Sequence, residues 1–597
     1  MFRLARYLKN YKKESIIGPL FKMLEAFFEL LVPLVVADMI DNGIGKGDRT
    51  YIYKAALILI LLGVVGLVCS LIAQFFAAKA SAGFGTELRD DLFAHMNRLS
   101  YAELDKAGTS TLVTRITSDM NQVQAGVNMI LRLFLRSPFI VIGALIAAFL
   151  VNAKVAVIFL IAAPILAFII YGIMIVTIPM YAGAQKALDR ISLATREGLN
   201  GARVIRAFGR QQDETAEFCE DCGLLLKLQK RVGKVSAAMN PLTYVVVNLA
   251  IAAIILQGGR EVDAGVLTQG EVIALVNYMT QILNALVALQ VLIVSFTKAV
   301  ASAKRINEVL ALQPTVLDKE ETVPAGEGRS ERAAGKTVGE GKQAATGETV
   351  PAVCFLEVSF TYPGAKEEAL TNLSFSVIKG QTVGIIGGTG SGKSTLVNLL
   401  PRFYDVTKGA VLLNGVDVRD YPQKELRSKI GIVPQKAVLF SGTIRDNMRW
   451  GKADATDEEI EEALSIAQAK EFVDTKEGRL DYKLTQGGRN LSGGQRQRLT
   501  IARALVRRPE ILILDDSASA LDFATDAALR RAISERTKGM TVFMVSQRTA
   551  TIRNADVIIV LEDGEIAGMG THCELYETCE VYREICQSQA SAKEVQE

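Results

Sequence analysis

Long hydrophobic runs, broken by shorter polar stretches, dominate the first half of the chain. Six of these runs are long enough to cross about 30 Å of hydrocarbon as helices. They cover residues 16–40, 55–78, 131–151, 155–178, 235–257 and 272–296. One such run would also suit the buried core helix of a water-soluble domain. Six in succession favour a membrane domain with six transmembrane helices.

Charge and loop length predict how this domain is oriented. Connections 41–54, 152–154 and 258–271 are short, whereas 79–130 and 179–234 each exceed fifty residues. The N-terminal segment and the two long connections hold 20 Lys and Arg residues, against 5 in the short connections. Because basic loops stay in the cytosol, we expect a multi-pass protein of the cell (plasma) membrane with both long connections cytoplasmic. Apolar residues at helical spacing in these connections predict helices that continue beyond the bilayer.

The first span contains Lys22, Glu25, Glu29 and Asp38. An ionisable group within a span normally faces a partner or a wet cavity, which favours a substrate-facing wall. The alternative is that the first two or three lie in a cytosolic or interfacial extension, and both interpretations stay open. Pro33 in the same span is expected to kink the helix.

The chain changes character after residue 312. Residues 313–352 are rich in Gly, Glu, Lys, Thr and Ala, a composition that buries too little apolar surface to offset the entropy of ordering. The sequence therefore predicts a membrane domain over 1–312, a flexible linker over 313–352, a soluble α/β domain over 353–590 and a C-terminal tail over 591–597.

A phosphate-binding loop lies near the start of the α/β domain. After a predicted strand at 382–386 come Gly387, Gly388, Thr389, Gly390, Ser391, Gly392, Lys393, Ser394 and Thr395, and then a predicted helix. The pattern is G-x4-G-K-[ST]. Its glycines let backbone N–H groups surround phosphates, Lys393 adds a positive charge and the Ser394 hydroxyl reaches Mg²⁺. We expect ATP and Mg²⁺ as cofactors.

Two further motifs follow in the same domain. The apolar run 511–514 ends in Asp515, as expected of a buried strand that delivers a carboxylate to the metal. Upstream, Leu491 precedes a predicted helix that opens with Ser492, Gly493, Gly494 and Gln495. The N-terminus of that helix can bind an anion. Because the phosphate loop already holds the phosphates of its own nucleotide, a second anion site implies a second nucleotide.

These motifs, in this order, resemble the ABC transporter superfamily over nearly the whole chain except the linker. The six-span layout, with Pro33 and Asp41-Asn42-Gly43, resembles the exporter branch: a six-span α-helical transmembrane domain joined to an α/β P-loop nucleotide-binding domain. The resemblance implies a head-to-tail dimer in which each ATP lies between one phosphate loop and the LSGGQ loop of the other protomer. It also implies coupling helices near residues 108–115 and 203–212.

The resemblance implies roles for further residues. Tyr362 would stack on adenine, Gln435 would contact Mg²⁺ and water, and residues 519–522 would form the D-loop. The metal ligands would be Ser394, Gln435 and Asp515.

Two positions depart from the family pattern. Asp516 stands where hydrolytic members carry Glu as the general base, so its carboxylate is set back by roughly 1.5 Å. A misplacement of about 1 Å can reduce a rate on the order of a hundredfold. Gln547 stands at the switch position, where the family has His, and an amide cannot become a cation or relay a proton.

Both departures weaken hydrolysis and leave the ATP-binding motifs intact, as in the degenerate-site subunit of heterodimeric bacterial multidrug exporters. The expected partner is a second ABC half-transporter, and the expected substrate is amphipathic: a drug, lipid or peptide leaving the cytosol or inner leaflet. The alternatives are a homodimeric exporter, an importer with the exporter fold, as in some siderophore systems, and a regulatory subunit or channel.

Composition excludes other classes of protein. Half of the residues are hydrophobic and the net charge is +3, so no polyanion-binding surface is implied and nucleic acid is not an expected partner. The seven cysteines are scattered, which favours free thiols. Cys219 and Cys222 form one CxxC pair, but a zinc site needs two more ligands.

Overall fold

The computed structural model describes residues 2–318, 350–517, 521–537 and 539–594. The chain divides into two compact units, one of Met1–Asn97 with Gly108–Leu312 and the other of Arg98–Ala107 with Gln313–Glu597. Most of the predicted linker (319–349), two predicted D-loop residues (Ser519 and Ala520) and the last three residues of the predicted tail lie outside the described residues. The domain limits derived from composition stay predictions.

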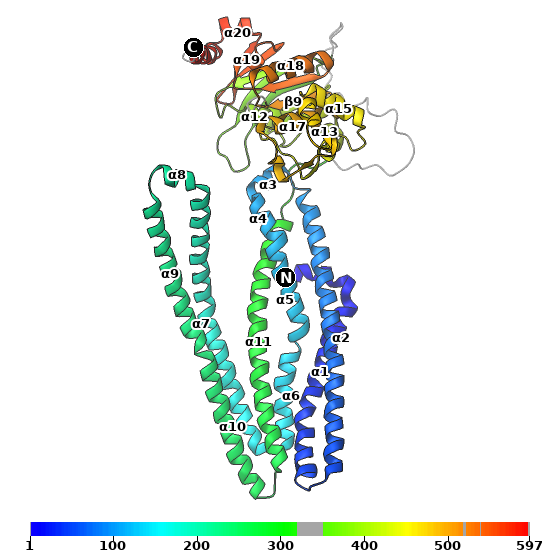
Figure 1. Cartoon of the computed structure of the whole chain (residues 1–597), viewed down its shortest axis with the longest axis vertical. Coiled ribbons are helices and arrows are strands. Elements are labelled where there is room, and N and C mark those ends of the chain that lie inside the picture. The colour runs from blue at the N-terminus through cyan, green and yellow to red at the C-terminus, as the bar shows by residue number, and fades with distance from the viewer. Residues whose placement is uncertain (1, 319–349, 518–520, 538, 595–597) are drawn as a thin grey trace. The chain divides into compact units, whose positions relative to one another are not determined.

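The first unit is built from helices (Figure 1). In chain order they are η1 (Phe2–Tyr11), α1 (Lys12–Asp38), η2 (Met39–Ile44), α2 (Arg49–Met96), α4 (Thr109–Thr114), η3 (Arg115–Asp119), α5 (Met120–Leu133), α6 (Arg136–Val151), α7 (Ala153–Asn200), α8 (Ala202–Ala207), α9 (Gln211–Ala237), α10 (Met239–Asp263) and α11 (Gln269–Leu310).

Five helical stretches of the described residues are long and apolar enough to cross a membrane: Arg49–Met96, Thr109–Val151, Ala153–Asn200, Gln211–Asp263 and Gln269–Leu310. Each contains one of the predicted spans. The remaining predicted span, 16–40, coincides with α1, a 27-residue helix that is also long enough. Lys22, Glu25 and Glu29 make α1 less apolar than the other five.

Ion pairs offset the charges of α1. Lys22 lies 2.6 Å from Glu25, with side chains only 8% and 17% exposed, and it also donates to Ser70 of α2 at 3.3 Å. Glu29 pairs with Arg136 at 2.7 Å, but its side chain is 41% exposed. Lys22 and Glu25 are therefore an internal pair, whereas Glu29 remains accessible.

Pro33 lies inside α1, which continues to Asp38. Because proline has no N–H, it frees the carbonyl four residues before it. That carbonyl, of Glu29, accepts from Gln281 Nε2 of α11 at 3.3 Å, and the Leu30 carbonyl accepts from the Tyr278 hydroxyl at 2.8 Å. Contacts between helices thus replace a bond within the helix, as a membrane interior requires.

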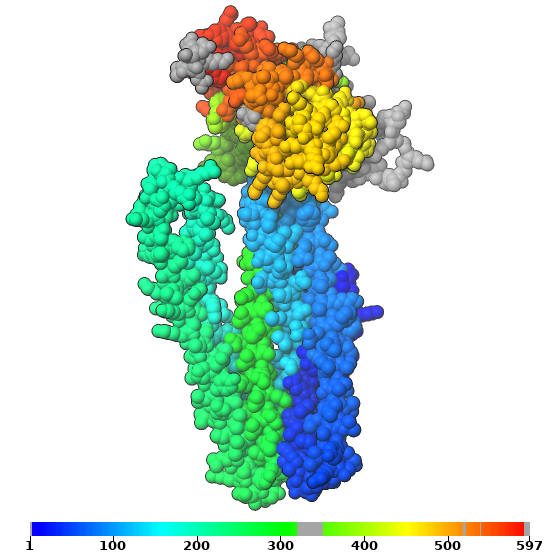
Figure 2. Space-filling model, in the orientation of Figure 1, coloured from blue at the N-terminus to red at the C-terminus, as the bar shows by residue number. Residues whose placement is uncertain are grey.

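Several helices are longer than a bilayer requires. Helices α2 and α7 have 48 residues each, which is about 72 Å at 1.5 Å per residue against about 30 Å of hydrocarbon. They therefore continue outside the membrane, as the long connections predicted. Helices α7 and α9, joined by α8, form a hairpin, and near α8 open space lies between it and the neighbouring helices (Figure 2). Further from α8, α7 packs against α11.

The second unit begins with α3 (Tyr101–Ala107), which lies between α2 and α4 in sequence, and continues after Gln313. Its strands are β1 (Val353–Phe360), β2 (Leu370–Val377), β3 (Thr382–Gly387), β4 (Lys408–Leu413), β5 (Val416–Asp417), β6 (Ile430–Val433), β7 (Gly442–Thr443), β8 (Lys483–Leu484), β9 (Ile511–Asp515), β10 (Thr541–Val545), β11 (Val557–Glu562) and β12 (Glu565–Gly570). Its later helices are α12 (Lys393–Leu399), α13 (Gln423–Lys429), α14 (Ile444–Arg449), α15 (Asp457–Ile466), α16 (Lys470–Asp474), η4 (Arg479–Asp481), η5 (Gln486–Gly488), α17 (Gly493–Leu505), α18 (Phe523–Arg536), α19 (Thr549–Ile552), α20 (His572–Thr578) and α21 (Glu580–Glu594).

Two larger sheets organise this unit. One has the order β12-β11-β3-β10-β9-β6, in which all strands but the edge strand β12 run parallel. The other is antiparallel, with the order β2-β1-β4-β5. In the parallel sheet β9 is completely buried, because both faces are covered by apolar side chains. Neighbouring strands β3, β10 and β9 therefore end at the same edge, where ligands of such sheets bind.

Candidate functional site

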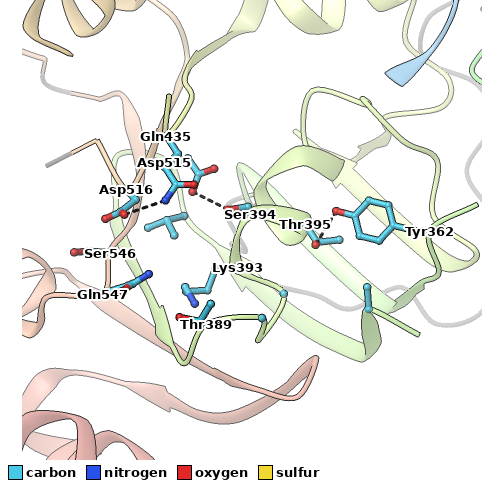
Figure 3. A pocket seen from close by; sticks show the side chains of 14 residues that line it. Tyr362, Thr389, Lys393, Ser394, Thr395, Gln435, Asp515, Asp516, Ser546 and Gln547 are labelled. Atoms are coloured by element: carbon cyan, nitrogen blue, oxygen red, sulfur yellow. Dashed lines mark hydrogen bonds between the residues drawn. The ribbon is translucent and has the colours of Figure 1, made fainter. Parts of the chain in front are cut away.

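The carboxyl ends of β3, β10 and β9 converge on a pocket of about 390 Å³ (Figure 3). Strand β3 leads into the glycine-rich loop, β9 ends in Asp515, and β10 leads to Ser546 and Gln547. The predicted residues that line the pocket are Tyr362, Thr389, Gly390, Gly392, Lys393, Ser394, Thr395, Gln435, Asp515, Asp516 and Gln547. Residues far apart in sequence thus form one site.

Lys393 is held by the loop that it follows. Its Nζ donates to the Gly387 carbonyl at 3.0 Å and to Ser391 Oγ at 3.2 Å, and also to the Gly388 carbonyl. Burial lowers the pKa of Lys393, although Asp515 and Asp516 act in the opposite direction. A buried cation is costly unless a counter-charge compensates it, so this position suits the phosphates of a nucleotide.

The loop geometry requires glycine at position 392. Gly392 has φ +92°, and a Cβ there would lie 2.9 Å from the Ala369 carbonyl oxygen and 2.6 Å from Leu370 Cδ2. A side chain would be both strained and crowded. Gly392 precedes α12, so the first N–H groups of that helix point towards the pocket edge, where they favour an anion.

Two of the three predicted Mg²⁺ ligands lie together. Ser394 Oγ donates to Asp515 Oδ1 at 3.0 Å. Burial raises the pKa of Asp515, while the hydrogen bond from Ser394 lowers it in part. A bound cation would stabilise the ionised carboxylate, and a hydroxyl next to a carboxylate is a donor set that Mg²⁺ accepts. These residues therefore fit the metal.

Asp516 is oriented by its backbone. It has φ +46°, a left-handed conformation that Asp tolerates better than most residues, and its N–H donates to the Val545 carbonyl at 3.0 Å. Its carboxylate accepts from Gln435 Nε2 at 3.3 Å. The predicted base position and Gln435 therefore lie next to each other in the pocket (Figure 3).

Gln547 also lines the pocket and is exposed. Its carbonyl accepts from Gln589 Nε2 of α21 at 2.7 Å. The two histidines lie elsewhere: His95 contacts the Val309 carbonyl at 3.1 Å in the first unit, and His572 contacts the Tyr582 hydroxyl at 2.9 Å. No histidine replaces Gln547 among the described residues that line this pocket.

The loop of Ser492, Gly493, Gly494 and Gln495 is not part of the pocket. Ser492 caps α17: its hydroxyl accepts from the Gln495 N–H at 3.2 Å, while Gln495 Oε1 accepts from the Ser492 N–H at 3.1 Å. Ser492 and Gly493 are exposed. The loop predicted as a second anion site is therefore accessible at Ser492 and Gly493 and does not line this chain's own nucleotide pocket.

An aromatic cluster connects the pocket to α3. The Tyr362 ring lies 5.4 Å from the Tyr404 ring, and the Tyr404 hydroxyl donates to Asp105 of α3 at 2.8 Å. Tyr101 of α3 contacts Phe403 with ring centroids 4.4 Å apart. Burial raises the pKa of Tyr404, and the Asp105 carboxylate raises it further, so the phenol remains a donor.

The segment with α3 lies just before the predicted coupling helix. The family resemblance implied a coupling helix near residues 108–115, whereas the segment that belongs to the second unit is Arg98–Ala107. Gly108, with φ +75°, ends it. The sequence also missed three pocket residues: Ala369, Val545 and Ser546. Ala369 and Val545 are apolar, and only the position of Ser546 next to Gln547 could have suggested its location.

We expect Tyr404→Phe to loosen α3, because it removes a hydrogen bond to a carboxylate and keeps the ring contacts. Such a bond contributes about 1.5–3 kcal/mol, so hydrogen-exchange protection of α3 falls by roughly tenfold or more. Hydrogen–deuterium exchange with mass spectrometry on the purified chain measures this protection. Tyr421→Phe is the matched control, since the Tyr421 hydroxyl donates to the Leu413 carbonyl at 3.2 Å; unchanged protection in Tyr404→Phe would contradict the prediction.

Comparisons with known proteins agree with this architecture. Residues 15–286 match the family model of the ABC transporter transmembrane region, and residues 370–519 match the ABC transporter model. An uncharacterized ABC transporter ATP-binding protein of Mycobacterium tuberculosis is 36% identical over 592 residues, covering 98% of both chains. An ATP-dependent lipid A-core flippase of Vibrio vulnificus is 29% identical over 584 residues, covering 98% of this chain and 96% of that protein.

A solved structure has the same fold. The structure of a bacterial Atm1-family ABC exporter with ATP bound aligns with a TM-score of 0.79 and 23% identity, covering 97% of this chain and 99% of that one. The predicted fold class is confirmed, and so are the multi-pass membrane location and the cytoplasmic nucleotide-binding domain. The chain belongs to the ABC transporters, as an exporter-type half-transporter that couples ATP hydrolysis to transport.

Proposed function

We propose that this half-transporter works as the degenerate-site subunit of a heterodimeric exporter. The observation that carries the proposal is the composition of its pocket, where the ATP-binding residues Lys393 and Ser394 lie with Asp516 and Gln547. The first two residues retain nucleotide affinity. The shorter carboxylate and the amide support only slow turnover.

The pocket residues divide the binding of ATP and Mg²⁺ and the hydrolysis step among them. Tyr362 stacks on adenine, the loop 387–395 surrounds the phosphates, and Ser394, Gln435 and Asp515 hold Mg²⁺, which screens the phosphate charge. Asp516 orients the attacking water poorly because its carboxylate is short, and Gln547 donates a hydrogen bond to the terminal phosphate without supplying a positive charge.

The accessible loop 492–495 completes the hydrolytic site of the partner subunit. The N-terminus of α17 is exposed there at Ser492 and Gly493, and an anion is the ligand that such a helix end favours. The partner would carry Glu and His at the positions of Asp516 and Gln547. One protomer thus contributes the loop, and the other contributes the general base.

Helix α8 supports the need for a partner. None of its residues is buried, although it carries Val204 and is followed by Phe208, which is 77% exposed. Large apolar side chains at the tip of a cytosolic hairpin favour docking onto another protein surface. In the proposed dimer this surface belongs to the other subunit.

A polar face within the spans supports an amphipathic substrate. Asn277, Gln281 and Asn284 follow one face of α11, where Asn277 and Asn284 are exposed, and accessible Glu29 contacts the same helix through its carbonyl. Among the described residues, buried Gln281 Oε1 and Arg136 Nε have no hydrogen-bond partner. Polar groups at this depth favour a wet pathway, whereas the surrounding span residues are apolar. We propose that a drug, lipid or peptide leaves the cytosol or inner leaflet along this face.

Purification of the chain alone tests the proposal. We expect it to bind ATP but to hydrolyse it slowly. Its turnover number should lie far below the roughly 1–10 per second that is usual for enzymes. Co-expression with a half-transporter that has Glu and His at the two positions should restore that rate. Full turnover by this chain alone would instead favour a homodimer.

A further inference from the structure

A large apolar cavity lies in the first unit, outside the nucleotide pocket and away from the polar face of α11. It has a volume of about 770 Å³ and is lined by residues of η1, α2, α5 and α11 and by Phe134, which follows α5. Every lining residue is Leu, Ile, Val, Phe or Ala. An apolar cavity of about 150 Å³ already stays dry and binds benzene, so a cavity about five times larger suits a hydrocarbon chain.

The cavity cannot close by a simple shift of η1, because polar contacts fix this helix on α2. Arg6 pairs with Asp91 at 3.0 Å, the Tyr7 hydroxyl donates to the same carboxylate, and Asn10 donates to Glu87 at 2.9 Å. Tyr11 lies against the backbone at Gly83, where a Cβ would meet its ring at 2.1 Å. The space between η1 and the pair α5–α11 therefore persists.

The cavity is open to its surroundings. Leu4 and Phe84 are almost fully buried in its wall, whereas Phe134, Phe296 and Val300 are 58%, 42% and 37% exposed. An exposed rim of this kind is stable next to lipid and unfavourable next to water. A hydrocarbon chain can therefore enter from the bilayer.

The helix that forms one wall, η1, carries exposed basic residues beside the cavity lining. These are Arg3, Arg6 and Lys9, and the exposed Lys12 and Lys13 follow at the start of α1. The first acidic residue of the chain is Glu14. Arg3 and Lys9 flank the lining residues Leu4, Ala5 and Leu8. Each Lys or Arg near a membrane surface attracts anionic lipid electrostatically, and the basic N-terminus lies on the cytosolic side.

From this juxtaposition we propose that the cavity binds an acyl chain of an anionic phospholipid of the cytoplasmic leaflet, with the headgroup at Arg3 and Lys9. The site is separate from the nucleotide pocket and does not depend on whether the transporter is a heterodimer. Since α5 and α11 line the cavity, the bound chain contacts two of the helices that leave the membrane on the cytosolic side, where Asp119 and Arg305 form an ion pair between η3 and α11.

Fluorescence quenching by brominated lipids tests the site in the full-length protein reconstituted in nanodiscs. The reporter is Phe296→Trp, which keeps an aromatic ring at the rim; the native Trp450 lies in the second unit and gives a constant background. We expect phosphatidylglycerol brominated on its acyl chains to quench the reporter at least about threefold more efficiently than brominated phosphatidylcholine. Leu61→Trp, on an exposed part of α2, is the control and should be quenched equally by both lipids.

Two further results decide the proposal. Arg3→Ala with Lys9→Ala should abolish the preference for phosphatidylglycerol and leave the Leu61→Trp control unchanged. Equal quenching of Phe296→Trp by both lipids would refute the headgroup preference. Absence of quenching, as expected if a partner subunit covers the cavity, would refute the lipid site itself.

Discussion

Gly493→Asp in this chain is expected to lower ATP turnover of the heterodimer on the order of a hundredfold or more. The exposed N-terminus of α17 would meet the phosphates bound by the partner subunit. Loss of a preorganised hydrogen-bond donor of this kind reduces catalytic rates by about 10²–10³-fold. The new carboxylate would place a negative charge at that position. An acidic residue in the first helical turn stabilises a helix, so the loss would not reflect unfolding of α17.

Two control variants accompany this experiment. A Cβ at Gly493 would meet no atom of the described residues within 4 Å, so Gly493→Ala tests added bulk without added charge and should reduce turnover less. Lys393→Ala should impair only this chain's own site, and we expect less than a tenfold loss. Steady-state ATPase assays of the three co-purified heterodimers measure these rates. If Lys393→Ala were as damaging as Gly493→Asp, the assignment of a degenerate site would be wrong.

Asp516→Glu combined with Gln547→His is expected to raise turnover of the isolated chain by one to two orders of magnitude. The Glu side chain restores roughly 1.5 Å of reach, and a displacement of about 1 Å accounts for on the order of a hundredfold in rate. Histidine adds a group that can carry positive charge near neutral pH. ATPase assays of the purified single and double variants measure the gain.

Asp516→Glu should also change the thermal stability of the chain, because of the backbone conformation at residue 516. Because residue 516 has φ +46°, a conformation in which Asp is several-fold enriched, Glu should be less stable there than Asp by at most about 1 kcal/mol. We expect a lower thermal midpoint together with faster hydrolysis. Asp516→Asn is the control that removes the carboxylate, and it should not hydrolyse faster. No gain in the double variant would mean that other features of the site limit turnover.

The nucleotide pocket was largely predictable because its motifs are local in sequence. The residues from Gly387 to Thr395 must form one loop, and the buried run that ends in Asp515 must be a central strand. Parallel strands bring their carboxyl ends to one edge, so Ser394 and Asp515 were expected to meet. They lie within hydrogen-bond distance.

The predictions were weaker where no local pattern exists. Ala369 lines the pocket as an ordinary apolar residue before β2, and α3 belongs to the second unit although it lies within the membrane half of the sequence. The contact between Tyr404 and Asp105 joins residues 299 positions apart. Pairings of this kind depend on how helices and sheets pack, which a short window of sequence does not encode.

By itself the sequence determined that this chain crosses a membrane several times, orients its basic loops to the cytosol and carries a phosphate-binding α/β domain, because hydrophobic length, charge and glycine spacing act locally. Only the tertiary structure decided that Lys22 and Glu25 form an internal pair while Glu29 stays accessible, and that η1 leaves an apolar cavity beside α5 and α11. These features arise from the packing of helices distant in sequence, where the position of each side chain depends on all of its neighbours at once.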